Sequence, residues 1–262
     1  MKKFLFILKR VAQLILIIAV VGVFIFTLMS SVDKAKNRVC SSIQVDIDFP
    51  SSFQLINEAE ILSLTNAVLG REIVGKPLIS LNLKKVEQAL KKNVYVENAE
   101  VYVDQHQLLH IDVRQRVPFL RVINNDGVSY YLTESHIKMP LHDNFTVNVP
   151  IAIGYVKTFD DNLIDSITQQ KLVELVKIIE RDSFLSSMID HIEVLENKKI
   201  RLHPRVTDHV ISLGEVDVTT SKRLDNLKHF YAKVMAKGNW EKYQMINIEM
   251  AGQIVGTKRD NI

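Results

Sequence analysis

The sequence has little of what stabilises small exported domains by covalent bonds. Cys40 is the only cysteine among 262 residues, so no disulfide can form within the chain and a packed apolar core must hold it together. A lipid-bearing cysteine would need small, apolar residues before it, whereas Asn37, Arg38 and Val39 precede Cys40. We therefore interpret Cys40 as a bystander thiol.

Residue patterns that carry catalysis or metal binding are also missing. Neither an HExxH pattern nor a G-x-S-x-G turn occurs, and a single cysteine excludes a zinc knuckle. Only nine glycines occur, and none forms a phosphate-cradling loop. Asp46 and Asp48 are interpreted as the solvated face of a strand, and the eight histidines as surface or locally bonded side chains. We expect no catalytic residue, no metal and no cofactor.

The one long apolar run lies near the start of the chain. Residues 11–29 contain no charged side chain, and these nineteen residues at ~1.5 Å each make a helix of roughly 28 Å, about the apolar thickness of a bilayer. Four cations and no anions lie in residues 1–10, which the positive-inside rule places in the cytoplasm. We predict a single-pass protein of the inner (plasma) membrane, with a transmembrane helix at residues 11–31 and a periplasmic C-terminal part.

A cleaved secretory signal is the alternative interpretation of this run. The run is longer than the usual apolar core of a signal, and no A-x-A-like site follows it, although Ser30 and Ser31 are small. When the four N-terminal cations are set aside, the rest of the chain contains 29 Lys and Arg and 30 Asp and Glu, so its net charge is close to zero. The exported part therefore has no basic surface of the kind that binds nucleic acid.

Residues 38–116 have the pattern of a small α+β module. Apolar and polar residues alternate over residues 43–49, as in a half-buried strand. Asn57 and Glu60 form a capping box for one helix, and Asn82 caps a second helix. Two more alternating segments complete the order β-α-α-β-β. Two helices on one face of a small sheet leave the other face and an edge for solvent or a partner.

Residues 117–258 are predicted to form a mostly β domain with two helices laid on it, followed by a short tail at 259–262. The helices are expected at about 168–181 and from Thr220, as N-cap, to Gly238. Strands are expected at 119–123, 128–132, 137–139, 147–149, 151–153, 192–195, 199–202, 210–213, 245–250 and 253–258. Because only four residues follow Lys258, we expect residues 245–258 to form an uncovered sheet edge that a partner strand can extend.

Short motifs run in order through both modules. The first module contains Gly75-Lys76-Pro77-Leu78-Ile79-Ser80-Leu81, then Val86 and Leu90, then Ile111-Asp112-Val113-Arg114-Gln115-Arg116-Val117-Pro118. The second contains Val210-Ile211-Ser212-Leu213-Gly214, Lys222-Arg223-Leu224 and the final pair of strands. The ordered set resembles the bacterial cell-division family FtsQ (DivIB), with Ile79 in place of the usual aromatic residue and Gln115 in place of the usual acid. The resemblance implies a POTRA domain at 38–116 and an FtsQ-type β domain at 117–258.

The resemblance also implies a function. FtsQ proteins are non-catalytic scaffolds of the divisome that link cytoplasmic and periplasmic division proteins at the septum. Their last region recruits FtsB, which comes with FtsL, and their POTRA domain contacts other division proteins. Carried over by position, the partner-binding residues are Phe230, Tyr231, Tyr243, Ile246, Ile248, Glu249, Met250, Gly252 and Ile254. The family's basic and aromatic pair is absent at Glu249 and Met250, and Ile248→Pro is expected to remove a ladder donor and abolish docking.

Two other functions stay open. One is a POTRA-bearing component of a protein-export apparatus, although such proteins usually have tandem POTRA domains or an outer-membrane barrel. The other is a signal-anchored periplasmic hydrolase, for which the sequence offers no nucleophile constellation.

Overall fold

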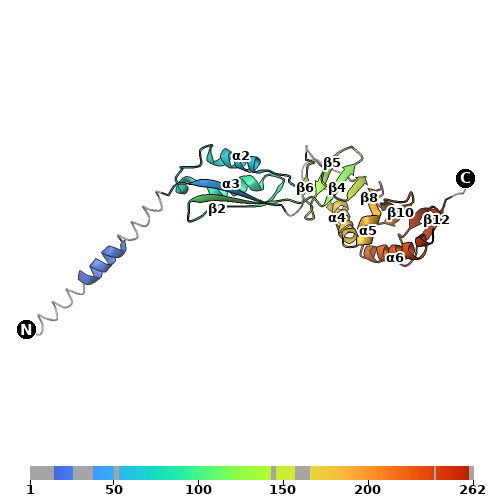
Figure 1. Cartoon of the computed structure of the whole chain (residues 1–262). Helices are drawn as coiled ribbons and strands as arrows, with labels where there is room; N and C mark the ends of the chain where they lie inside the picture. Colours follow the sequence, from blue (N-terminus) through green and yellow to red (C-terminus); the bar gives the residue numbers. More distant parts are fainter. Residues whose placement is uncertain are drawn as a thin grey trace, which may run out of the picture. The chain divides into compact units, whose positions relative to one another are not determined.

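The computed structural model describes residues 15–25, 38–49, 53–142, 146–156, 166–238 and 240–259. The chain divides into two compact units, Met1–Gln115 and Arg116–Ile262, which are described separately below. Figure 1 shows the elements of both units.

A helix at residues 15–25 precedes the folded part of the first unit (Figure 1). All of its side chains are exposed, and they are apolar except at one glycine. In the part of the chain that the structure describes, no helix has the length and apolar character needed to cross a membrane. The transmembrane helix predicted at residues 11–31 extends beyond this helix into 11–14 and 26–31, which lie outside the described residues. The span therefore stays a prediction.

The first unit has the predicted order β-α-α-β-β. Its elements are β1 (Ser42–Asp48), α2 (Glu58–Leu69), the short 3-10 helix η1 (Leu78–Ser80), α3 (Leu83–Lys91), β2 (Val96–Val103) and β3 (Leu108–Gln115). The sheet order is β1-β3-β2, with β1 parallel and β2 antiparallel to the central β3. The capping box at Asn57 and Glu60 and the cap at Asn82 are confirmed, which explains where both helices begin.

Gln115, the last residue of β3, connects this strand to the segment before α2. Its side chain is buried, its Nε2 donates to the Phe53 carbonyl at 3.1 Å, and its Oε1 accepts from the Leu55 N–H. The site needs one donor and one acceptor, which an amide supplies and a carboxylate does not. The amide at position 115 therefore has a local structural reason.

Within its described residues, the second unit is built on one nine-stranded sheet. Its strands are β4 (Leu120–Asn124), β5 (Ser129–Leu132), β6 (Lys138–Met139), β7 (Ile151–Gly154), β8 (Ile189–Val194), β9 (Ile200–Pro204), β10 (Val210–Gly214), β11 (Tyr243–Asn247) and β12 (Val255–Lys258). The sheet order is β12-β11-β10-β9-β8-β7-β4-β5-β6, so the last strand of the chain forms one edge.

The helices that the structure describes beside this sheet are α4 (Ser166–Glu180), α5 (Ser183–Met188), α6 (Thr220–Lys233) and the short 3-10 helix η2 (Met235–Lys237). Figure 1 shows α4, α5 and α6 along one side of the sheet. Leu172 and Leu175 of α4 and Leu224 and Leu227 of α6 belong to the same buried core as the inward side chains of the strands. The mixed α+β class is as predicted.

Several details of the second unit differ from the sequence-based prediction. No strand forms at 147–149, because the Val147 N–H donates instead to the hydroxyl of buried Tyr131 at 2.9 Å. Helix α5 was not predicted; it has only six residues, and Asp182 caps it. Thr219, not Thr220, is the N-cap of α6, and the Thr220 hydroxyl accepts from the Asp217 N–H at 2.9 Å.

Candidate functional site

The candidate site is the free edge at β12. The Arg259 N–H, directly after this strand, donates to the Lys242 carbonyl at 3.0 Å. Because backbone groups of successive residues point to opposite sides of a strand, Val255, Thr257 and Arg259 face β11. Gly256 and Lys258 therefore direct their N–H and C=O groups away from the sheet. Within the described ranges no strand lies beyond β12, so these groups form an unpaired row.

Aromatic side chains support this edge. A Cβ added to Gly256 would lie 2.5 Å from Cε1 of Tyr243, so the tyrosine ring fills the space above the glycine. The Tyr243 ring meets the Phe230 ring edge to face, with 5.8 Å between centroids. A cross-strand aromatic ring of this kind compensates for the packing that glycine lacks in a strand. Residue 256 must therefore be glycine for Tyr243 to keep its place.

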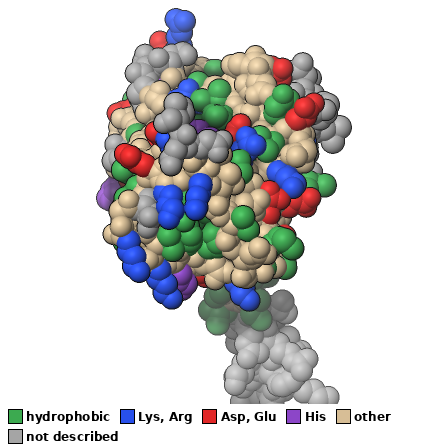
Figure 2. All heavy atoms as spheres, turned by 90° about the vertical axis from the view of Figure 1, so that its right-hand side faces the viewer, with side chains coloured by type: hydrophobic (Ala, Val, Ile, Leu, Met, Phe, Trp, Pro, Cys, Tyr) green, Lys and Arg blue, Asp and Glu red, His purple; other side chains and the backbone are tan. Residues whose placement is uncertain are grey.

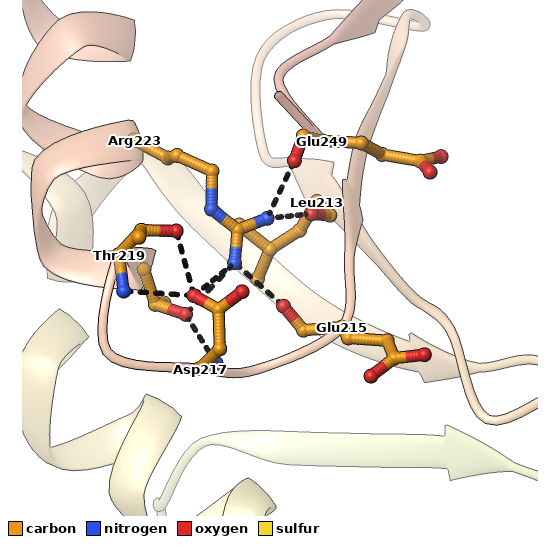
Figure 3. Close-up of polar contacts among 7 residues, drawn as sticks. Leu213, Glu215, Asp217, Thr219, Arg223 and Glu249 are labelled. Atoms are coloured by element: carbon orange, nitrogen blue, oxygen red, sulfur yellow. Dashed lines mark hydrogen bonds and ion pairs between the residues drawn. The ribbon is translucent and has the colours of Figure 1, made fainter. Parts of the chain in front are cut away.

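A buried guanidinium ties the β11–β12 hairpin to the start of α6 (Figure 3). The acceptors of Arg223, which is 2% exposed, are the carbonyls of Leu213, Glu249 (3.4 Å) and Glu215 (2.6 Å), the Asp217 carboxylate (3.0 Å) and the Thr220 hydroxyl (3.0 Å). One side chain thus holds the end of β10, the turn before α6 and the residue that leads into the hairpin turn. Both terminal nitrogens of the Arg223 guanidinium, Nη1 and Nη2, have acceptors. Its Nε has no partner among the described atoms.

Asp217 is the anionic member of this cluster. The Thr219 hydroxyl donates to its Oδ1 at 2.7 Å and the Thr219 N–H at 2.8 Å (Figure 3). The hydrogen bond from the Thr219 hydroxyl is the main cause that lowers the pKa of Asp217, and the charge of Arg223 adds to it. The carboxylate is therefore ionised where Arg223 needs a counter-charge.

Glu249 makes its own contacts across three strands. Its carboxylate accepts from Lys199 Nζ at 2.7 Å and from the Ser212 hydroxyl at 2.8 Å. The hydrogen bond from Lys199 is the largest cause that lowers the pKa of Glu249. Gly214, with φ +77°, passes so close that an added Cβ would lie 2.8 Å from Glu249 Cγ. Glu249, which follows β11, is therefore held to β10 and to the residue directly before β9.

Comparison with known proteins decides the family. A POTRA-like domain model matches residues 38–114. A second model, FtsQ/DivIB, C-terminal related, matches residues 117–257, more than half of the chain.

The chain belongs to the FtsQ/DivIB family.

No curated protein matches this chain. FtsQ/DivIB is a family of division proteins without enzymatic activity, and the two matched domains fit a divisome scaffold.

In this FtsQ/DivIB protein, the docking residues carried over by position do not share one exposed strand. Ile246, Ile248 and Tyr231 are buried in the core, and Phe230 and Tyr243 are partly buried against it. These five side chains support the edge from inside.

The carried-over residues of the hairpin turn are more accessible. Met250 is 69% exposed, Gly252 lies in the turn with φ +89°, and Ile254 is half-buried. The Ile248 N–H donates to the Ser212 carbonyl of β10 at 2.9 Å, so Ile248→Pro would break the interior of the sheet. Loss of docking in that variant would therefore not distinguish a lost docking contact from a disrupted sheet.

The predicted edge at residues 245–258 includes β12, but Gly256 and Lys258 are not among the partner-binding residues carried over by position, and the burial of Arg223 was not predicted. The sequence does contain a signal for Arg223. Residues 220, 224, 227 and 231 follow the helical spacing of a buried stripe, and position 223 falls on it. A cationic side chain on a buried helix face must have hydrogen-bond acceptors or a counter-charge, because burying an unpaired charge costs much free energy. Nothing in the sequence distinguishes the outward-facing residues of β12 from their neighbours.

The described histidines with defined ring contacts do not form a metal site. His191 and His203 stack across β8 and β9 with 4.4 Å between ring centroids, and His209 is buried beside the hydroxyl of Tyr231. Over the described ranges, no group of three or more His, Cys, Asp or Glu side chains is arranged to hold a metal ion.

Proposed function

We propose that this chain is a single-pass, non-catalytic scaffold of the bacterial divisome, located at the septum. Residues 1–10 lie in the cytoplasm, residues 11–31 cross the membrane, and the POTRA and β domains recruit periplasmic division proteins. The observation that carries this proposal is the uncovered β12 edge, which presents the N–H and C=O groups of Gly256 and Lys258. Within this FtsQ/DivIB chain, an FtsB-like protein, together with its FtsL-like companion, is the proposed partner at this edge.

Edge pairing alone supplies only part of the affinity. Gly256 and Lys258 offer four outward groups, and a net hydrogen bond contributes ~0.5–1.5 kcal/mol, which gives about 2–6 kcal/mol in total. Association costs on the order of 4–15 kcal/mol in lost freedom of motion. A partner strand must therefore gain the remaining free energy from side-chain contacts near the edge.

The membrane anchor rests on a separate observation. Each large apolar side chain between Ile15 and Ile25 that the structure describes is at least half exposed. A helix that is apolar all round is stable only when lipid or protein covers it. The four cations within residues 1–10 favour a cytoplasmic N-terminus.

Depletion of the protein and a fluorescent fusion test this function together. We expect filamentous cells with unfinished septa and a fusion concentrated at midcell. Loss of exported proteins in cells with normal septa would instead favour the export apparatus and contradict the proposal.

A further inference from the structure

A pocket of about 460 Å³ opens at the end of the sheet, beside the last residue of the edge. Its wall includes Phe184 and Met188 of α5, Tyr231 of α6 and Trp240. Arg259, the residue that follows β12, lies on the same wall. The free edge and the pocket therefore meet within one residue.

Several of the side chains that line this pocket are apolar and accessible. Val206 is 89% exposed, Phe184 42% and Trp240 41%. Large apolar side chains that are exposed together around a concave site mark a place where another molecule binds. Val218 is 100% exposed as well, but it does not line the pocket, and so it provides a matched control.

One polar atom in the wall has no partner among the described residues. Thr207 lines the pocket, and its hydroxyl oxygen is buried without a hydrogen bond. By contrast, the Tyr231 hydroxyl of the same wall is already bonded to His209 Nε2. An unused buried hydroxyl in an apolar pocket suits a side chain with an apolar body and a single polar group.

The charged side chains on the rim of the pocket carry both signs, so they do not favour a ligand of one charge. Arg259 lies 3.8 Å from Asp208, and Glu241 makes no ion pair within the described part of the chain. Figure 2, which views the right-hand side of Figure 1, shows apolar side chains interspersed with charges of both signs. This arrangement favours a neutral anchor, with a basic residue beside it to meet Glu241.

We propose that the pocket binds a tyrosine or tryptophan side chain of the same partner segment that pairs with β12. The inference rests on the proposed function and supplies the side-chain contact that edge pairing requires. The aromatic ring would contact Trp240 and Val206, and its O–H or N–H would donate to the Thr207 hydroxyl once that side chain turns its buried oxygen toward the pocket. Because Arg259 both follows β12 and lines the pocket, the anchor lies close in sequence to the paired segment.

Site-specific photo-crosslinking in cells separates this inference from the proposed function. A photoreactive amino acid is placed in the full-length chain at Lys258 on the edge, at Glu241 on the pocket rim, or at Val218 as control. We expect the same FtsB-like protein to be captured from 258 and 241 but not from 218. The peptide attached to 241 should contain a tyrosine or tryptophan beside the paired segment.

Affinity measurements with the purified full-length chain and that partner complete the test. Val206→Asp places a charge on the accessible rim and should weaken binding at least tenfold, whereas Val218→Asp should not change it; both should unfold at the wild-type temperature. Three outcomes would contradict aromatic binding in the pocket and leave edge docking intact. They are capture from 258 but not from 241, capture of a different protein from 241, and equal affinities of the two variants. No capture from 258 would overturn edge docking and the pocket with it.

Discussion

Replacing Arg223 by methionine tests whether the buried cluster holds the hairpin in place. Methionine keeps most of the apolar stem but leaves the carbonyls of Leu213 and Glu215 without their donor. A buried acceptor that loses its partner costs ~1–3 kcal/mol, and the half-exposed Asp217 can turn to water instead. Because the Glu215 carbonyl is only partly buried and can bond to water in part, we expect the free energy of unfolding of the second unit to fall by about 2–4 kcal/mol. For a domain of this size that lowers the melting temperature by roughly 10 °C.

Trp240 makes this measurement specific to the second unit. It is the only tryptophan of the chain and packs 5.8 Å from the Tyr231 ring, so its fluorescence in urea follows the unfolding of that unit alone. The matched control is Lys222→Met, which removes one positive charge from an exposed neighbour and should change stability by less than about 0.5 kcal/mol. If the Arg223→Met midpoint coincides with that of Lys222→Met, the cluster does not hold the hairpin.

Two further substitutions test the buried polar groups of each unit. Gln115→Glu sets a carboxylate against the Phe53 carbonyl and should cost the first unit about 1–3 kcal/mol at neutral pH, seen by circular dichroism in urea. The loss should shrink in acid as the protonated side chain regains a donor, and a loss that grows in acid would refute the donor assignment. Burial lowers the pKa of His209 from 6.5 to about 4. The neutral imidazole is therefore fully compatible with folding above pH 6.5, and the free energy of unfolding should fall by up to roughly 3 kcal/mol as the pH decreases toward 4. Trp240 fluorescence in urea across this range should show that slope, and His209→Asn should lack it; an equal slope in both proteins would show that another group titrates.

Local signals in the sequence predicted the first unit well. Asn57 with Glu60 and the cap at Asn82 act within one helical turn, so their hydrogen bonds follow from spacing alone. The strands of this unit alternate because one face of the sheet packs under the helices. Its order of elements could therefore be predicted without knowledge of the tertiary contacts.

The second unit depends on contacts between residues distant in the chain, which spacing does not reveal. Val147 has the apolar neighbours of a strand residue, but its N–H bonds to a tyrosine hydroxyl from β5. Ile248 falls in the predicted docking strand, yet it is buried and pairs with β10. The strand order, not the sequence pattern, decides which backbone groups remain unpaired at β12.

The central claim is that the outward backbone groups of β12 bind the partner. The most direct test compares the affinities of Lys258→Pro and Lys258→Ala for the FtsB-like partner, because both remove the charge but only proline removes the outward N–H. Since no hydrogen bond among the described residues depends on that N–H, both variants should fold as the wild type does. The account predicts that the proline variant binds the partner with an affinity about tenfold lower than that of the alanine variant, or lower still. Equal affinity of the two variants would contradict it.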